Sequence, residues 1–175
     1  KQVTILINDD KNKIQPIVDR TVLLVEAVNL ARDLSNLPPN DCSPSQLASI
    51  AVSVGTEYGL KTRIVERYEM ESMGLNGIVS VGKGSQNPPK LIILEYHGST
   101  GDRRPYLLVG KGVTFDTGGI SLKDSDKMDE MKFDKSGGCN VLAIMKAVAS
   151  LKLPINVVGI IPSVENMPSS TSYRP

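Results

Sequence analysis

The sequence is poor in aromatic side chains and almost balanced in charge. Trp is absent, aromatic residues make up 4% of the chain, and there are 20 basic residues against 19 acidic ones. Proteins that stack nucleic-acid bases need aromatic side chains, and nucleic-acid-binding domains usually carry a clear basic excess. The sequence therefore predicts no general nucleic-acid-binding surface.

Cysteines and long apolar runs are also scarce. Cys42 and Cys139 are the only two cysteines, and two isolated cysteines form neither a disulfide framework nor a zinc knuckle. We expect both to be buried free thiols. No apolar run approaches the roughly 18 residues that span a membrane, and the first residues lack the apolar core of a signal peptide. The sequence thus predicts a cytoplasmic protein in a reducing compartment, without membrane association.

The remaining composition is that of an ordinary globular domain. The chain has 175 residues, of which 40% are hydrophobic and 22% are charged, and this length allows one domain with a real core. The chain begins at Lys1 without Met and ends in "SSTSYRP". From these ends we expect a segment of a longer protein.

Strand-like and helix-like patterns alternate along the chain. The clearest helix signal is a capping box in which Ser43 is the N-cap, Pro44 follows and Gln46 is the third helical residue; this helix stops at Gly59. Helices are predicted at residues 16–34, 43–59, 67–75 and 137–151. Strands are predicted at residues 1–8, 61–66, 76–82, 91–96, 105–110 and 155–162, with those at 91–96 and 105–110 buried on both faces. The alternation predicts an α/β fold, a three-layer sandwich around a central mixed, largely parallel sheet.

The Gly-rich stretch "VGKGVTFDTGGISLK" (109–123) permits three interpretations: a phosphate cradle, a metal site or a tight turn. A phosphate loop needs G-x-x-x-x-G-K-[ST] and a dinucleotide site needs G-x-G-x-x-G. The stretch matches neither pattern, since Phe115 stands where the dinucleotide pattern requires its last glycine. Asp116 follows a predicted strand and Asp134 precedes a predicted helix, and ligands gather beyond the carboxyl ends of strands in α/β sheets. Carboxylates suit divalent cations, but an aspartate among glycines is also a common turn residue. Both of these alternatives stay open.

Several stretches, in order along the chain, resemble the leucine (cytosol) aminopeptidase family of two-metal exopeptidases. The resemblance runs from about residue 22 to the last residue. It is carried by "ARDLSNLPPNDCSPSQLA", "VSVGKGSQNPPKLIILEY", "VGKGVTFDTGGISLK", "MDEMKFDKSGG" and "LPINVVGIIPSVENMPSS". It implies an α/β catalytic domain, of which residues 16–175 are the N-terminal part. Residues 1–15 would then be the tail of a preceding N-terminal domain or a linker.

The resemblance also implies a set of site residues. By motif position, Lys111, Asp116 and Asp134 match metal ligands, and Asp116 would bridge two divalent ions, Mn²⁺ or Zn²⁺. Lys123 matches the catalytic lysine, and Met131 matches a position in the pocket for the substrate's N-terminal side chain. Metal-activated water would then cleave the first peptide bond of peptide or aminoacyl substrates.

The same resemblance carries expectations about the whole protein. The family is typically a homo-hexamer, and some relatives have an architectural or DNA-binding role, which is the alternative function; the balanced charge of this chain argues against that alternative. The family motif "NTDAEGR", which supplies further metal ligands, does not occur in the sequence. We therefore expect the 175 residues alone to be inactive.

Two other polar residues have alternative interpretations. His97, the only histidine, lies beside a turn signal and is expected at the surface rather than at a metal. Glu165 matches a family position in "SVENMP" and is expected either to hold a loop or to support the site.

Overall fold

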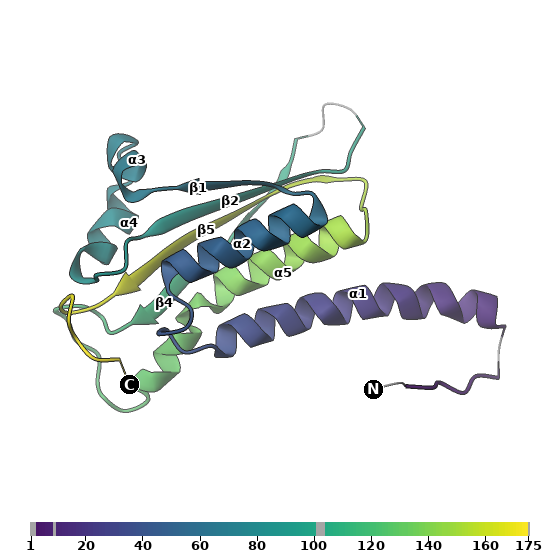
Figure 1. The fold of residues 1–175 in the computed structure, drawn as a ribbon, viewed down its shortest axis with the longest axis horizontal. Coiled ribbons are helices and arrows are strands. Elements are labelled where there is room, and N and C mark those ends of the chain that lie inside the picture. Colours follow the sequence, from purple (N-terminus) through teal and green to yellow (C-terminus); the bar gives the residue numbers. More distant parts are fainter. Residues whose placement is uncertain (1–2, 9, 101–103, 175) are drawn as a thin grey trace.

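The computed structural model describes residues 3–8, 10–100 and 104–174, in which helices and strands alternate (Figure 1). The helices are α1 (Lys11–Asn36), α2 (Pro44–Tyr58), α3 (Arg67–Ser72), α4 (Asn76–Val81) and α5 (Ser136–Ser150), with short 3-10 helices η1 (Gly82–Gly84) and η2 (Met128–Lys135). The strands are β1 (Lys61–Val65), β2 (Lys90–His97), β3 (Tyr106–Val109), β4 (Gly112–Asp116) and β5 (Asn156–Asn166). None of the helices in these described ranges is both long and apolar enough to cross a bilayer.

The long strand β5 is the centre of a mixed sheet. The strand order is β1-β2-β5-β3, and β4 also pairs with β5. The β1–β2 and β2–β5 pairs are antiparallel, whereas β3 and β4 both run parallel to β5. The strands β3 and β4 pair with successive parts of β5, so that Tyr106 lies beside Val157 and Asp116 lies beside Asn166 at the end of the ladder. This register brings the Gly-rich stretch to the carboxyl end of β5.

Helices cover both faces of this sheet, as alternate residues of β2 show. Ile92 and Leu94 are fully buried in the main core, together with residues of α2 and α5. Leu91 and Ile93 pack instead against the second core, which contains Met70 of α3 and residues of α4. Figure 1 shows α2 and α5 on one side of the strands and α3 and α4 on the other. The predicted α/β sandwich with a mixed sheet is thus confirmed.

Helix α1 lies outside this sandwich, against α5 and away from the sheet (Figure 1). The two helices meet through alanines, with Ala27 and Ala31 of α1 packed on Ala143 and Ala147 of α5. Small side chains at a crossing let helix axes come close together. The predicted helix at 16–34 is therefore confirmed and extended at both ends, since α1 continues through Pro16 to its N-cap Asp10.

Two predicted strands are wrong. Residues 3–8 of the predicted strand 1–8 form no secondary structure and are exposed, because their apolar side chains find no partner strand; residues 1–2 lie outside the described residues. Residues 76–82 form α4 and the start of η1 instead of a strand. Leu75, Ile78 and Val79 pack together in the second core, and their spacing of three and four residues is that of one helix face.

The strand β4 was not predicted. The strand β3 was predicted to be buried on both faces, but it is largely exposed. Phe115 and Thr114 of β4 are fully buried, within a stretch that the sequence indicated only as a Gly-rich loop. A side chain at Gly110 would lie 2.3 Å from the carbonyl of Gly137, so this glycine serves the close approach of the chain to the start of α5. In β3, by contrast, Leu107 is 65% exposed, because β3 is an edge strand of the described sheet.

Candidate metal centre

The candidate site lies where β4 and β5 end. Asp116 is the last residue of β4, and the loop that follows leads through a tight turn to η2. The five site residues predicted from the sequence lie in three segments: the link between β3 and β4, the loop after β4, and η2. The fold brings them into one cluster of contacts, which consists of Lys111, Asp116, Lys123, Met131 and Asp134. Residues up to 23 positions apart in the sequence, which no local pattern could bring together, are thus neighbours.

Two lysines and two aspartates form a chain of ion pairs in this cluster. The Nζ atom of Lys123 lies 2.8 Å from Oδ2 of Asp116, and the Nζ atom of Lys111 lies 4.0 Å from that same oxygen. Lys111 is also 2.8 Å from Oδ2 of Asp134. Both carboxylates are largely buried and both lysines are more exposed, so the positive charges approach the carboxylates from the solvent side.

The other oxygen of Asp116 is held from the protein side. Its Oδ1 accepts hydrogen bonds from the backbone N–H of Gly118, at 3.0 Å, and from Nδ2 of Asn166, at 2.7 Å. Burial alone would raise the pKa of Asp116, but hydrogen bonds from Lys123, Gly118 and Asn166 outweigh burial and lower this pKa below its ordinary value. Asp116 is therefore kept as an oriented carboxylate.

The two glycines after Asp116 form the turn that the sequence indicated. Gly118 and Gly119 have φ angles of 88° and 72°, a left-handed conformation that favours glycine. A side chain at Gly118 would also lie 2.3 Å from the carbonyl of Ser121. The turn is closed by a hydrogen bond of 2.9 Å from the N–H of Lys123 to the carbonyl of Thr117. The turn thus brings the Lys123 ammonium group back to Asp116.

Asp134 supplies the observation that best fits a metal ion. Its Oδ2 is buried and accepts no hydrogen bond of ordinary geometry within the described residues, although Lys111 forms an ion pair with it. A buried carboxylate needs a positively charged partner, and Lys111 is the one that the structure provides. The oxygens of Asp116 and Asp134, with the amine of Lys111, are donor types that divalent cations accept. Within the described ranges, however, no three His, Cys, Asp or Glu side chains gather as metal ligands, so this donor set fits only part of a site.

A hollow of about 600 Å³ lies beside the lysine of this cluster. Lys123 and Met131 line it, with the Nζ atom of Lys123 3.1 Å from the sulfur of Met131. Its other lining residues are partly apolar and partly charged: Leu122, Asp124, Asp126, Lys127, Met128 and Glu130. Lys123 thus joins this hollow to the ion-pair cluster.

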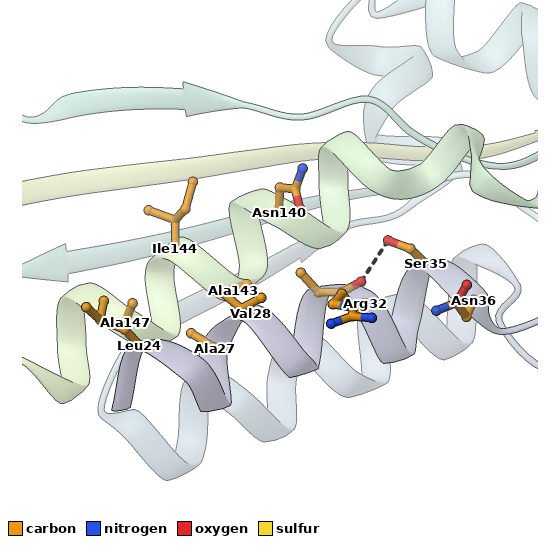
Figure 2. Close-up of a pocket in the computed structure, with 11 residues that line it drawn as sticks. Leu24, Ala27, Val28, Arg32, Ser35, Asn36, Asn140, Ala143, Ile144 and Ala147 are labelled. Carbon is orange, nitrogen blue, oxygen red and sulfur yellow. Dashed lines mark hydrogen bonds between the residues drawn. The ribbon is translucent and has the colours of Figure 1, made fainter. Parts of the chain in front are cut away.

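A second hollow lies away from the candidate site. An apolar groove of about 730 Å³ runs between α1 and α5, and none of the five predicted site residues lines it. Figure 2 shows Leu24 and Val28 of α1 and Ile144 of α5 at this groove. Leu24 and Val28 are 41% and 55% exposed.

Asn166 was not among the predicted site residues, and Glu165 had two alternative interpretations. Glu165 is fully buried and accepts hydrogen bonds from Ser85, Asn87 and Arg174, so it holds the segment after η1 and the last described residues against β5. This position supports the loop interpretation of Glu165. Asn166 directly follows it and contacts Asp116; it lies in the same stretch "SVENMP", but no role was predicted for it.

Lys135 was also missed, although it directly follows Asp134. Its side chain is fully buried, and Nζ donates hydrogen bonds to the carbonyls of Ser35, Leu37 and Lys132 at 3.2, 2.7 and 2.6 Å. Burial lowers the pKa of Lys135. Lys135 therefore fastens η2, and with it Asp134, to the end of α1.

The predicted burial of the two cysteines and the predicted exposure of the histidine are confirmed. Cys42 and Cys139 are buried and free, and burial raises the pKa of the Cys42 thiol to about 11. His97 lies exposed at the end of β2, 3.2 Å from Glu95. Neither the thiols nor the imidazole belongs to the ion-pair cluster.

Known proteins resemble this chain in sequence and structure. Residues 29–175 match the model of the catalytic domain of the cytosol aminopeptidase family. A probable cytosol aminopeptidase of Cenarchaeum symbiosum (strain A) is 54% identical over 152 residues, which is 87% of this chain and 31% of that protein. A probable cytosol aminopeptidase of Azoarcus sp. (strain BH72) is 45% identical over 176 residues, which is 100% of this chain and 35% of that protein.

A solved structure of the bottromycin maturation enzyme BotP in complex with Mn superimposes with a TM-score of 0.82 at 37% identity. That match covers 91% of this chain and 34% of the BotP chain. The chain thus spans about a third of the length of the relatives that it matches. The matched catalytic-domain model, these identities and the shared fold show that the chain belongs to the cytosol aminopeptidase family.

Proposed function

We propose that this chain is part of the catalytic domain of a metal-dependent aminopeptidase, a longer protein that we call the parent protein. The parent protein would release N-terminal amino acids from peptides in the cytoplasm. The observation that carries the proposal is the cluster in which Asp116 and Asp134, both largely buried, meet Lys111 and Lys123. Family membership supplies the reaction class.

In this proposal Lys111, Asp116 and Asp134 are the residues of this chain that would hold the divalent ions. Lys111 would bind as a neutral amine after losing its proton, as metal ligands must. The ions, when bound, supply Lewis acidity and a water molecule of lowered pKa. The ions would be Mn²⁺ or Zn²⁺, and the BotP relative has been solved with Mn.

Lys123 is the proposed catalytic residue. Its side chain borders the hollow of about 600 Å³, and its Nζ donates a hydrogen bond of 2.8 Å to Oδ2 of Asp116. A positively charged donor at this place can stabilise the negative charge that develops on the oxygen of the attacked peptide carbonyl. Met131, on the same hollow, would contact the side chain of the substrate's first residue.

The oligomeric state and the alternative function rest on the family resemblance and on composition, not on contacts in the structure. We propose a homo-hexameric parent protein from the resemblance, which light scattering on the purified protein can check. The architectural or DNA-binding alternative has no support in the composition, since the chain carries 20 basic and 19 acidic residues.

The test is metal-dependent hydrolysis by the parent protein. We expect turnover of leucine p-nitroanilide with Mn²⁺ or Zn²⁺, and loss of turnover after chelation. Asp116→Asn should lower kcat/KM by more than about 100-fold, because even the loss of a partner of a metal ligand costs up to that much. Asp19→Asn, on the exposed face of α1, is the matched control and should leave kcat/KM unchanged. Turnover that survives chelation, or survives in Asp116→Asn, would contradict the proposal.

A further inference from the structure

Asn166 gives Asp116 two separate kinds of support. The two residues end neighbouring parallel strands and lie side by side in the ladder. The main-chain carbonyl of Asn166 accepts hydrogen bonds from N and Oγ1 of Thr117, at 3.0 and 2.8 Å. The side-chain amide donates separately to Oδ1 of Asp116, at 2.7 Å. A change in the side chain alone therefore leaves the backbone pairing of β4 with β5 in place.

The amide fixes which oxygen of Asp116 faces the lysines. A carboxylate can only accept hydrogen bonds, so the amide nitrogen of Asn166 must face it. With the N–H of Gly118, this amide places two neutral donors on Oδ1. The other oxygen, Oδ2, faces the ammonium groups of Lys111 and Lys123. Rotation of the carboxylate would break both bonds to Oδ1.

The turn is shaped to admit this amide. A Cβ atom at Gly119 would lie 3.0 Å from Oδ1 of Asn166, tighter than ordinary contact. Any larger residue at Gly119 would also have to adopt a φ of 72°. The glycine therefore leaves room for the Asn166 side chain beside Asp116.

We propose that Asn166 is a positioning residue for the metal centre. Its neutral amide holds Oδ1 of Asp116 so that Oδ2 faces the metal ions, and it does so without adding a positive charge that would compete with them. Hydrogen-bond partners of metal ligands orient those ligands, and their loss costs about 10–100-fold in metal affinity or activity. This inference rests on the proposed function.

The experiment measures Mn²⁺ affinity and steady-state kinetics of the parent protein. The variants are Asn166→Ala, which removes the donor, and Asn166→Leu, which removes the donor but keeps the size. The matched control is Asn87→Ala, because Nδ2 of Asn87 also donates to a buried carboxylate, Glu165, at 3.0 Å. Electron paramagnetic resonance of free Mn²⁺ reports affinity independently of turnover.

We expect both Asn166 variants to bind Mn²⁺ about 10–100-fold more weakly than the unchanged protein. At saturating Mn²⁺ their kcat should be lower and their KM nearly unchanged. Asn87→Ala should lower the Tm but leave Mn²⁺ affinity unchanged. If Asn166→Ala does not fold, the Mn²⁺ affinity of Asn166→Leu tests the inference. Equal Mn²⁺ affinity in the Asn166 variants, with or without a lower Tm, would overturn the inference alone. Absence of Mn²⁺ binding in the unchanged parent protein would overturn the proposed function and this inference with it.

Discussion

At the scale of single residues, the two lysines of the cluster differ in what they contact. Lys111 lies between two carboxylates, 2.8 Å from Asp134 and 4.0 Å from Asp116. Lys123 contacts one carboxylate and the sulfur of Met131 on the wall of a hollow. This difference fits the proposed division between a metal ligand and a charged group that faces the substrate.

The division predicts the effect of removing Lys123 from the parent protein. Lys123→Ala should lower kcat by about 10²–10³-fold, the usual cost of losing one donor to a developing oxyanion, and should leave Mn²⁺ affinity nearly unchanged. Lys61→Ala is the matched control, because Lys61 also forms an exposed ion pair, with Glu95 at 3.2 Å, but lies outside the cluster. Turnover and Mn²⁺ titration check both. A kcat that stays within a few-fold of the unchanged protein would refute the assigned role.

At the same scale, the family motifs predicted which residues meet, but not how they are held. The structure brings all five predicted residues into contact, while their chemical roles stay predictions. Asn166 and Lys135 lie in stretches that carry the resemblance, but no role was predicted for either of them. Both act by contact with residues distant in the sequence, since Asn166 bonds Asp116 and Lys135 bonds Ser35 and Leu37.

At the scale of elements, the site depends on where β5 ends. Glu165, fully buried one residue before that end, accepts hydrogen bonds from Ser85, Asn87 and Arg174. Burial alone would raise the pKa of Glu165, but the hydrogen bonds from Arg174, Ser85 and Asn87 outweigh it and lower this pKa below 4.5, its ordinary value. The carboxylate form is therefore favoured by the fold.

This network predicts a pH dependence of stability. Because the folded pKa of Glu165 is lowered, its contribution is fully present above about pH 4.5 and is lost as the pH falls through the folded pKa. Glu165→Gln should cost about 3 kcal/mol at pH 7, since it leaves Arg174 without its buried partner. The Tm difference from the unchanged parent protein should shrink below pH 4.5.

Thermal unfolding between pH 3 and pH 7 measures this difference, with the pH range chosen around the ordinary value of 4.5. Glu26→Gln, on the exposed side of α1, serves as control and should show little difference at any pH. A Tm difference for Glu165→Gln that does not change with pH would contradict the linkage.

At the scale of the whole molecule, the described chain leaves apolar side chains uncovered. Val25 and Val28 of α1 are 50% and 55% exposed, and Tyr106 and Val109 of the edge strand β3 are 66% and 68% exposed. The chain also spans about a third of the length of its relatives. Exposed apolar surface of this kind on a domain favours association.

We therefore expect the purified 175-residue chain to bind the dye ANS and to self-associate in light scattering. It should not hydrolyse leucine p-nitroanilide at any Mn²⁺ concentration, because the cluster brings together only two carboxylates, Asp116 and Asp134, within the described residues. The parent protein, assayed in parallel, is the positive control. Measurable turnover by the chain alone would show that the two carboxylates and the lysines suffice.

The sequence by itself determined the features that depend on neighbouring residues. The N-cap Ser43, whose side chain accepts a hydrogen bond from the N–H of Gln46, and the left-handed Gly59 bound α2 as predicted. A helix end is decided by the few residues that satisfy its own N–H and carbonyl groups. The family resemblance of the motifs around Asp116 and Asp134 likewise named the members of the cluster, although only the fold brings the two motifs together.

Only the tertiary structure decided the features that depend on partners distant in the sequence. Residues 76–81 are helical because Ile78 and Val79 share one face in the second core, and residues 112–116 are a strand because β5 offers them a parallel edge. The pairing of β4 with β5 also places Asn166 beside Asp116. A strand's hydrogen bonds join it to another segment, so its own sequence cannot supply them.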